Sequence, residues 1–222
     1  MKKIFILLVF IITALPLSAQ ANIFRIAAGA QSQLENLLNK PGMVKPASAV
    51  PLGKNWFTLE TDAHVFSDEV TLKQVVAVLL DLENQPRYFK GKRSELDLKI
   101  VNRTENEIIV DFISIAIVVG IRMKTPYRAA LKVITNTETA FGIDLNQLPQ
   151  DSETNKDIKK LTAPRYVEEV TINGKKYTYI RIYSIMDVDA KILPNARNTL
   201  ERNSTPTNEE ALHMIINAAK TK

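Results

Sequence analysis

Residues 67–89, SDEVTLKQVVAVLLDLENQPRYF, encode a helix with clear start and stop signals. Thr71 and Gln74 have the spacing of a capping box, which marks a helix N-terminus. Pro86 forbids continuation of the helix, and residues 87–89 predict one short extra turn. The apolar positions recur at helical spacing and predict one buried face; they are Leu72, Val75, Val76, Leu79 and Leu82.

Segments typical of β-strands lie on both sides of this helix. One strand is predicted before it, at residues 55–66, and the others follow at 96–102, 107–117, 122–134, 139–145, 166–172 and 175–188. Short turns join most of these segments, and Asn173-Gly174 is a strong hairpin signal. Strands joined by short turns pair antiparallel, so the sequence predicts an antiparallel sheet.

The chain is predicted to end in a helix that covers one face of this sheet. Thr205 and Pro206 fit the N-cap and first positions of that helix. A stripe of Ala211, Leu212, Ile215, Ile216 and Ala219 follows. An N-terminal helix is expected over residues 22–39 and a linker over 43–53. Residues 147–162 are expected to be a polar insertion. The fold class is therefore α+β.

The first residues are typical of a secretory signal peptide. Lys2 and Lys3 precede an apolar run over residues 4–12, and Ala19-Gln20-Ala21 fits a cleavage site. The run is shorter than the roughly 20 residues of a membrane-spanning helix. We therefore expect an exported, soluble protein of the bacterial periplasm or the extracellular medium, without disulfides because the chain has no Cys.

The predicted division of the chain is a signal peptide (1–21), an N-terminal helix and linker (22–54), and one domain (55–222). The formal net charge is +5, and removal of Lys2 and Lys3 with the signal peptide leaves about +3. Nucleic-acid binding requires a concentrated basic face, so no nucleic-acid partner is expected.

The order of elements over residues 55–222 resembles the START-like (SRPBCC, polyketide cyclase/lipid-transfer) superfamily and its helix-grip fold. Residues 67–89 resemble its first helix with the Asp-x-Glu-Asn-x-Pro exit, and residues 117–122, IVVGIR, resemble its connection between central strands. The resemblance implies a curved antiparallel sheet of about six to seven strands around a long C-terminal helix, with an apolar cavity between them.

The resemblance also implies a non-catalytic carrier or sensor that binds a hydrophobic small molecule, such as a lipid, in that cavity. One alternative is a protein-interaction module of the same fold with a filled interior and an unknown protein partner. The other is a cyclase-like enzyme that uses Asp111, His64 or a Tyr as acid or base.

The strand over residues 122–134 best indicates which face of the sheet lines the cavity, because its other face is cationic. The predicted ligand-binding residues are Val110, Phe112, Met123, Tyr127, Leu131, Phe141, Ile182, Tyr183, Leu212 and Ile216. On residues 107–117 the opposite face carries four isoleucines, and an apolar outer face needs a cover. We expect the N-terminal helix or a partner to provide it.

Two charged residues are candidates for a polar anchor of the ligand. Asp111 lies among isoleucines, and Arg181 lies on a neighbouring predicted strand. A buried carboxylate is costly unless it is paired. The alternatives are an ion pair on the strand face and plain solvent exposure.

Aromatic residues adjoin cations in Tyr88, Phe89, Lys90, Lys92 and Arg93, which suits transient contact with an anionic membrane. The alternative is a solvated loop whose aromatic rings turn inward.

Catalytic and metal-binding motifs are missing from the sequence. His64 and His213 are the two histidines, and neither has metal-ligand spacing. We expect His64 to face solvent from its strand and His213 to lie on a helix surface. No catalytic residue, metal or cofactor is predicted.

Overall fold

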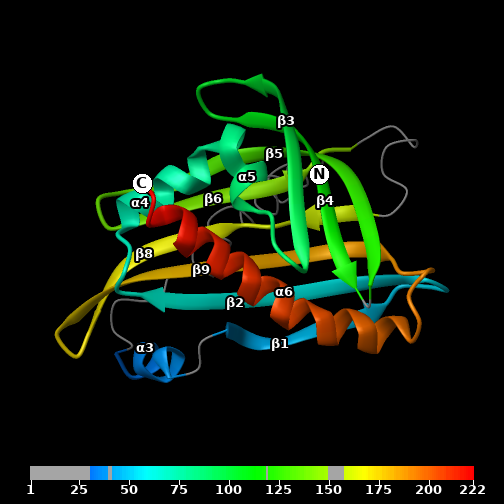
Figure 1. The fold of residues 1–222 in the computed structure, drawn as a ribbon, viewed down its shortest axis with the longest axis horizontal. Helices are drawn as coiled ribbons and strands as arrows, with labels where there is room; N and C mark the ends of the chain where they lie inside the picture. Colours follow the sequence, from blue (N-terminus) through cyan, green and yellow to red (C-terminus); the bar gives the residue numbers. More distant parts are fainter. Residues whose placement is uncertain (1–30, 40–41, 119, 150–157) are drawn as a thin grey trace, which may run out of the picture.

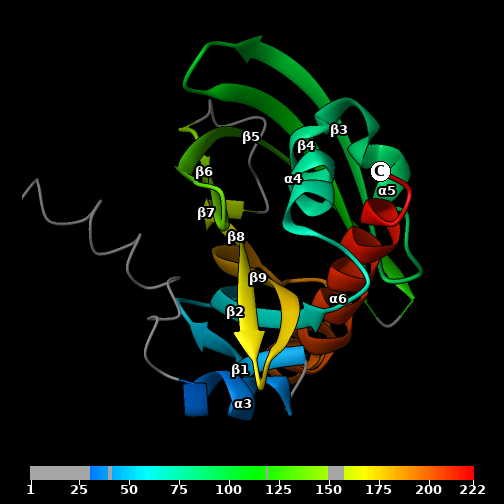
Figure 2. The same ribbon diagram turned by 90° about the vertical axis from the view of Figure 1, so that its left-hand side faces the viewer.

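In the part of the chain that the structure describes, nine antiparallel strands form one sheet, which curves around the C-terminal helix (Figures 1 and 2). The computed structural model describes residues 31–39, 42–118, 120–149 and 158–222. The strands are β1 (Gly42–Pro51), β2 (Trp56–Ser67), β3 (Ser94–Arg103), β4 (Ile108–Val118), β5 (Ile121–Asn136), β6 (Ala140–Gln147), β7 (Ile158–Thr162), β8 (Arg165–Ile172) and β9 (Lys175–Asp189). Their order in the sheet is β1-β2-β9-β7-β6-β5-β4-β3, and β8 pairs with β6 and β9.

Helices cover the inner face of this sheet. They are α4 (Leu72–Leu80), the short α5 (Gln85–Tyr88) and the long α6 (Ala196–Ala219), with a 3-10 turn, η1 (Leu82–Asn84), between α4 and α5. A further helix, α3 (Gln31–Leu38), lies beyond β1 and beside β8, on the other side of the sheet (Figure 2).

The predicted capping box is present at the start of α4. The Gln74 amide donates to the Thr71 hydroxyl at 3.3 Å, and the Thr71 amide donates to the Gln74 side chain at 2.9 Å. The buried face of α4 consists of Leu72, Val75, Val78 and Leu79. Local sequence and packing therefore specify the same helix.

The fold class is confirmed, but the described sheet has nine strands and not the six to seven predicted; two of the nine lie in segments that were not predicted as strands. Residues 43–53 were expected to be a linker, yet Gly42–Pro51 forms β1 at the edge of the sheet. Its prolines misled the prediction, although an edge strand tolerates proline because one side makes no ladder hydrogen bonds. The second addition is β7, in the predicted polar insertion. Residues 150–157 of that insertion and the predicted signal peptide lie outside the described residues.

The hairpin predicted at Asn173-Gly174 joins β8 to β9. Both residues have positive φ, 52° and 78°, as a two-residue type I′ turn requires. The dipeptide therefore fixes the register of this pair, in which Ile172 lies opposite Lys175.

The C-terminal helix begins ten residues earlier than predicted, at Ala196, so Pro206 lies inside it. Thr205 is therefore not its N-cap. Side chains around the proline hydrogen-bond to helix carbonyls, including those of Ser204 and Thr207 to Leu200 and Asn203, both at 2.7 Å. The predicted apolar stripe is confirmed, since Leu212, Ile215, Ile216 and Ala219 are buried.

The N-terminal helix does not cover the isoleucine face of β4, so that part of the prediction is wrong for the residues described. α3 contacts β8 instead, and Ile113 of β4 is 39% exposed. Because the sheet is curved, β4 lies away from α3, and α3 packs near β8 (Figure 2).

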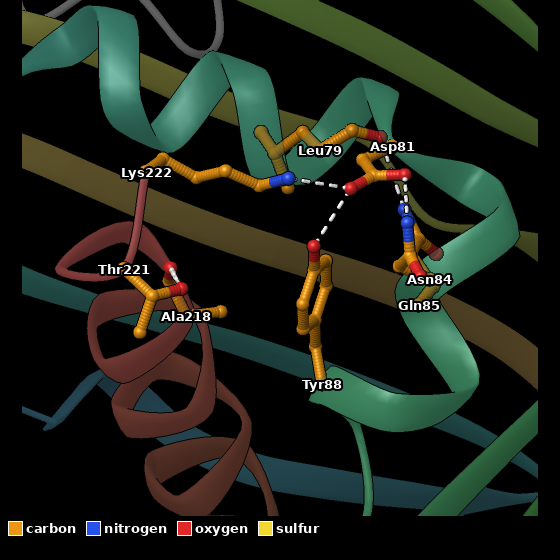
Figure 3. Close-up of polar contacts among 8 residues, drawn as sticks. All are labelled: Leu79, Asp81, Asn84, Gln85, Tyr88, Ala218, Thr221 and Lys222. Carbon is orange, nitrogen blue, oxygen red and sulfur yellow. Dashed lines mark hydrogen bonds and ion pairs between the residues drawn. The ribbon is translucent and has the colours of Figure 1, made fainter.

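A polar junction fastens the end of α6 to the α4–α5 connection (Figure 3). The Asp81 carboxylate accepts hydrogen bonds from Lys222 at 2.6 Å, Tyr88 at 2.7 Å and Asn84 at 2.8 Å. Nearby, the buried Gln85 side chain donates to the Leu79 carbonyl at 3.0 Å. These bonds, with that of Lys222 first, hold the pKa of Asp81 well below its ordinary value.

Because the pKa of Asp81 is lowered by folding, its carboxylate stabilises the fold above the unfolded-state pKa of about 4, and this contribution is lost as pH falls below that value. At neutral pH, Asp81→Asn should lower the free energy of unfolding by about 1 kcal/mol. The difference between wild type and variant should shrink between about pH 5 and pH 2. Urea denaturation across this range measures it; a difference that is constant with pH would contradict the assignment.

Candidate functional site

The inner face of the sheet and the first part of α6 enclose a cavity of about 330 Å³. Apolar side chains from distant strands form most of its wall, among them Leu59 of β2, Ala116 of β4 and Met186 of β9. The cavity adjoins the hydrophobic core, with which Leu145, Leu161 and Ile215 are shared. Its location and lining are those of a small-molecule pocket.

One face of α6 forms the cover of the cavity. Leu200, Ser204, Thr207, Ala211 and Ile215 line it at intervals of three or four residues. The hydroxyls of Ser204 and Thr207 donate to carbonyls one turn back in the helix. The polar side-chain atoms of this wall thus make their hydrogen bonds largely within α6. They therefore add little polarity to the surface of the cavity.

The cavity occupies only one end of the space between the inner face of the sheet and α6. At the other end, α4 and the second half of α6 fill this space. Val75, Val78, Leu79 and Leu82 pack there in one core cluster with Leu212 and Ile216 of α6. α4 and α6 are in direct contact in this region. The empty volume therefore remains where α6 faces the sheet without a second helix.

Four of the ten predicted ligand-binding residues border the cavity: Met123, Tyr127, Ile182 and Tyr183. The other six are buried in the filled end of the core rather than along the cavity; they are Val110, Phe112, Leu131, Phe141, Leu212 and Ile216. Strand alternation predicted the inward face correctly for the strand residues except Tyr183, which lies opposite Asp62 and projects to the outer face. It could not indicate how far along the sheet α4 would reach.

A single charged side chain, that of Arg165, lies among the described residues that line the cavity. Arg165 begins β8 and is paired in register with Ile143 of β6 and Ile182 of β9. Directly opposed residues project to the same side of a sheet, so Arg165 shares the inner face with these isoleucines. Its guanidinium lies 5.6 Å from the centre of the Phe89 ring, within cation–π range.

Burial lowers the pKa of Arg165 from its ordinary value. An arginine has so high a pKa that it remains protonated at neutral pH. Within the described parts of the chain, its side chain makes no hydrogen bond or ion pair. Among the described residues, this half-buried positive charge in the cavity wall faces the ring of Phe89 and no carboxylate.

Two hydroxyl groups lie in the same cavity wall. The oxygens of Tyr127 and Ser114 are 3.1 Å apart and share a hydrogen bond. The Tyr127 ring stacks on Phe112, with centroids 5.2 Å apart. Burial raises the pKa of Tyr127, so the phenol remains neutral at physiological pH.

The predicted anchor residues Asp111 and Arg181 do not pair with each other and do not line the cavity. Asp111 pairs with Arg128 across β4 and β5, at 2.6 Å, on the outer face. Arg181 makes two bonds to Asp62, at 2.8 and 2.6 Å, also on the outer face. The alternative of ion pairs on the strand faces is thus the correct one for both residues.

The prediction that His64 faces solvent is wrong. It is fully buried on the outer face of β2, where its ring contacts those of Phe66 and Tyr179 at centroid distances of 5.7 and 5.8 Å. A sheet therefore separates His64 from the cavity. His213 is exposed on α6, as predicted.

Tyr183 borders the cavity, but its hydroxyl donates to Glu60 at 2.9 Å. Burial, followed by this bond to Glu60, raises the pKa of Tyr183 to about 12. Tyr183 lies opposite Asp62, and its ring packs with Tyr166 and Tyr179 on the outer face, so its side chain contributes no surface to the cavity.

The aromatic residues of the predicted membrane patch turn inward. Phe89 is 6% exposed and lines the cavity, and the Tyr88 hydroxyl is bonded to Asp81. Lys90, Lys92 and Arg93 are exposed. The cations alone remain available for a membrane contact.

The loop that carries Lys90, Lys92 and Arg93 is fixed to α6 by the carboxylate of Glu210. The backbone amides of Lys92, Arg93 and Ser94 donate to Glu210 at 2.8, 2.9 and 3.2 Å. Gly91 lies so close to this carboxylate that a Cβ would stand 2.4 Å from its oxygen. The loop thus lies against the helix that covers the cavity.

No cluster of three acidic or histidine ligands is found among the described residues. Their helices include none with the length and apolar character needed to cross a bilayer.

The sequence reasoning missed two parts of the site. Arg165 was missed because a cation at the start of a strand carries no sequence signal of burial. The wall formed by α6 was missed because Ser204 and Thr207 look like turn residues. The spacing of Leu200, Ser204, Thr207, Ala211 and Ile215 is the signal that could have revealed it.

No family model and no curated protein matches this chain. A STAR-related lipid transfer protein from Xanthomonas axonopodis has a similar structure, with a TM-score of 0.51 at 9% identity over 79% of this chain and 99% of that chain. The chain has the START-like helix-grip fold.

Two further solved structures are similar at lower scores. The Zhui aromatase/cyclase from Streptomyces sp. R1128 has a TM-score of 0.49 at 14% identity, over 74% of this chain and 93% of that chain. The lipid transfer and protein localization domain of human StarD13 has a TM-score of 0.48 at 10% identity, over 85% and 94% of the two chains.

Two of the ion pairs on the outer face of the START-like sheet should differ sharply in their effect on stability. The side chains of Asp62 and Arg181 are 5% and 14% exposed, whereas those of Asp111 and Arg128 are 41% and 42% exposed. Asp62→Ala removes the carboxylate partner of a buried guanidinium and should cost about 3–5 kcal/mol. Asp111→Ala should cost much less, because solvent screens its partner. Urea denaturation of both variants measures the difference, and equal losses would contradict it.

Proposed function

We propose that this protein is an exported, non-catalytic carrier or sensor that holds a hydrophobic small molecule, such as a lipid, in the START-like cavity. The observation that carries the proposal is the cavity of about 330 Å³ with largely apolar walls. Binding would remove apolar surface of the ligand and of the wall from water, which is the main driving force in such sites.

The size of the cavity limits the ligand. Small-molecule pockets span about 300–1,000 Å³, and this one lies at the lower end of that range. A ligand with one chain or a small ring system suits it better than a lipid with two long chains. The lipid-transfer name of the similar Xanthomonas protein supports a lipid-like ligand.

The arrangement of titratable groups favours a binding protein over a cyclase-like enzyme. Catalysis would need two or more acid–base groups that converge in the cavity. Asp111 and His64, the residues considered for this role, lie on the outer face of the sheet. Tyr127 lines the cavity, but burial raises its pKa and makes it a weak acid.

Export is part of the proposal and rests on the sequence of residues 1–21. Protein recovered from the periplasm or medium should have the intact mass of a chain that starts at Asn22. Ala19→Arg should block this cleavage, since the signal peptidase site requires small residues. Recovery of uncleaved wild-type protein from the cytoplasm would contradict export without affecting the cavity.

Ligand binding can be tested with a variant that fills the cavity. Ala116 lines the cavity from β4, so Ala116→Phe should abolish the uptake of a neutral apolar fluorophore, N-phenyl-1-naphthylamine. Ile113→Phe is the matched control, because residue 113 lies on the same strand and faces outward, 39% exposed. This control should take up the fluorophore as the wild type does.

Native mass spectrometry of the purified wild-type protein, followed by organic extraction, should recover a bound apolar compound that Ala116→Phe lacks. Failure to recover any compound, together with no uptake of the fluorophore by wild type, would contradict the proposed function.

A further inference from the structure

We propose that the ligand of this cavity is a single-chain amphiphile with an oxyanion head group, a carboxylate or a phosphate monoester, and that Arg165 binds the head group. The inference rests on the proposed function, because it names the class of molecule that the cavity holds. Its basis is the position of one cation in a wall whose other described residues are uncharged.

The sheet places Arg165 so that its side chain must enter the cavity side. Its register partners Ile143 and Ile182 belong to, or pack against, the main core cluster. Its guanidinium lies over the ring of Phe89, which also lines the cavity. The charge is thus held at the cavity wall by the pairing of β8 with β6 and β9, and by Phe89, which directly follows α5.

None of the described residues supplies a counter-charge at this position. The described residues that line the cavity include no Asp or Glu, and the Arg165 side chain has no hydrogen bond or ion pair within the described ranges. A charge held away from water is costly unless it is paired. Elsewhere in the molecule buried arginine is paired, as Arg181 is with Asp62.

An oxyanion is the chemical group that would complete the site. A guanidinium binds carboxylate or phosphate through two parallel N–H···O bonds. The Tyr127 and Ser114 hydroxyls share one hydrogen bond at 3.1 Å, which uses one of their two hydrogens. The second hydrogen remains available to a head-group oxygen.

The remaining wall suits an alkyl chain. Leu59, Met186, Val188 and Leu200 line the cavity along β2, β9 and α6. The modest volume accommodates one chain more readily than two. An amphiphile would therefore lie with its head at Arg165 and its chain against these residues.

The test compares three probes with the same alkyl chain: dodecanol, dodecanoate and dodecyl phosphate. Binding is measured by isothermal titration calorimetry below the critical micelle concentration of each probe, in mildly alkaline buffer. Wild type should bind at least one of the two anions about tenfold to a hundredfold more tightly than dodecanol, as expected for a charge-assisted hydrogen bond. The anion that binds more tightly identifies the head group.

Arg165→Gln should lose this preference while its affinity for dodecanol stays within about twofold of wild type. Arg165→Lys keeps the charge without the fork of donors and should retain part of the preference. Lys92→Gln is the matched control, because it removes an exposed cation outside the cavity lining. Its anion preference should equal that of wild type.

Two results would overturn the inference. Equal binding of dodecanol and both anions by wild type would contradict the proposed head-group site and leave the proposed function intact. Full anion preference in folded Arg165→Gln would place the head group elsewhere. Failure of wild type to bind any of the three probes would instead count against the proposed function. The wild-type comparison needs no variant, so it stands even if Arg165→Gln does not fold.

Discussion

The packing of α6 across the inner face of the sheet is the interaction on which the rest of the structure depends. Its second half packs with α4 in the main core through residues such as Leu212 and Ile216. Its first half meets the sheet without a second helix and carries Ser204 and Thr207 where large apolar residues would fill the space. The helix α6 therefore completes the core with its second half and covers the cavity with its first half.

Much of the fold could be predicted from the sequence, because its signals are local. The Thr71 capping box, the Asn173-Gly174 turn and the alternation along β5 each specify their own element. β1 and the start of α6 could not be predicted, since both contain proline in positions that only tertiary context permits. An edge location accommodates Pro51 and Pro46, and packing over the sheet holds the helix together around Pro206.

The site was less predictable than the fold because it depends on which side chains lack partners. Arg165 and Arg181 are both strand arginines, and no sequence pattern separates them. Register gives Arg181 the buried carboxylate of Asp62 on the outer face and gives Arg165 two isoleucines on the inner face. Pairing makes Arg181 a structural residue. Arg165 has no acidic neighbour among the described residues of the cavity wall, which makes it a candidate for ligand recognition.

The cavity also links binding to stability. Empty space forfeits the dispersion contacts that a filled core would make, and the lone Arg165 adds a desolvation cost at the same place. The filled end of the core and the Asp81 junction must offset both costs in the ligand-free protein. A molecule that fills the space and pairs with the guanidinium would bind the native state alone, so it would stabilise the fold by mass action. The features that make the domain less stable when empty are therefore the ones that would give a ligand its affinity.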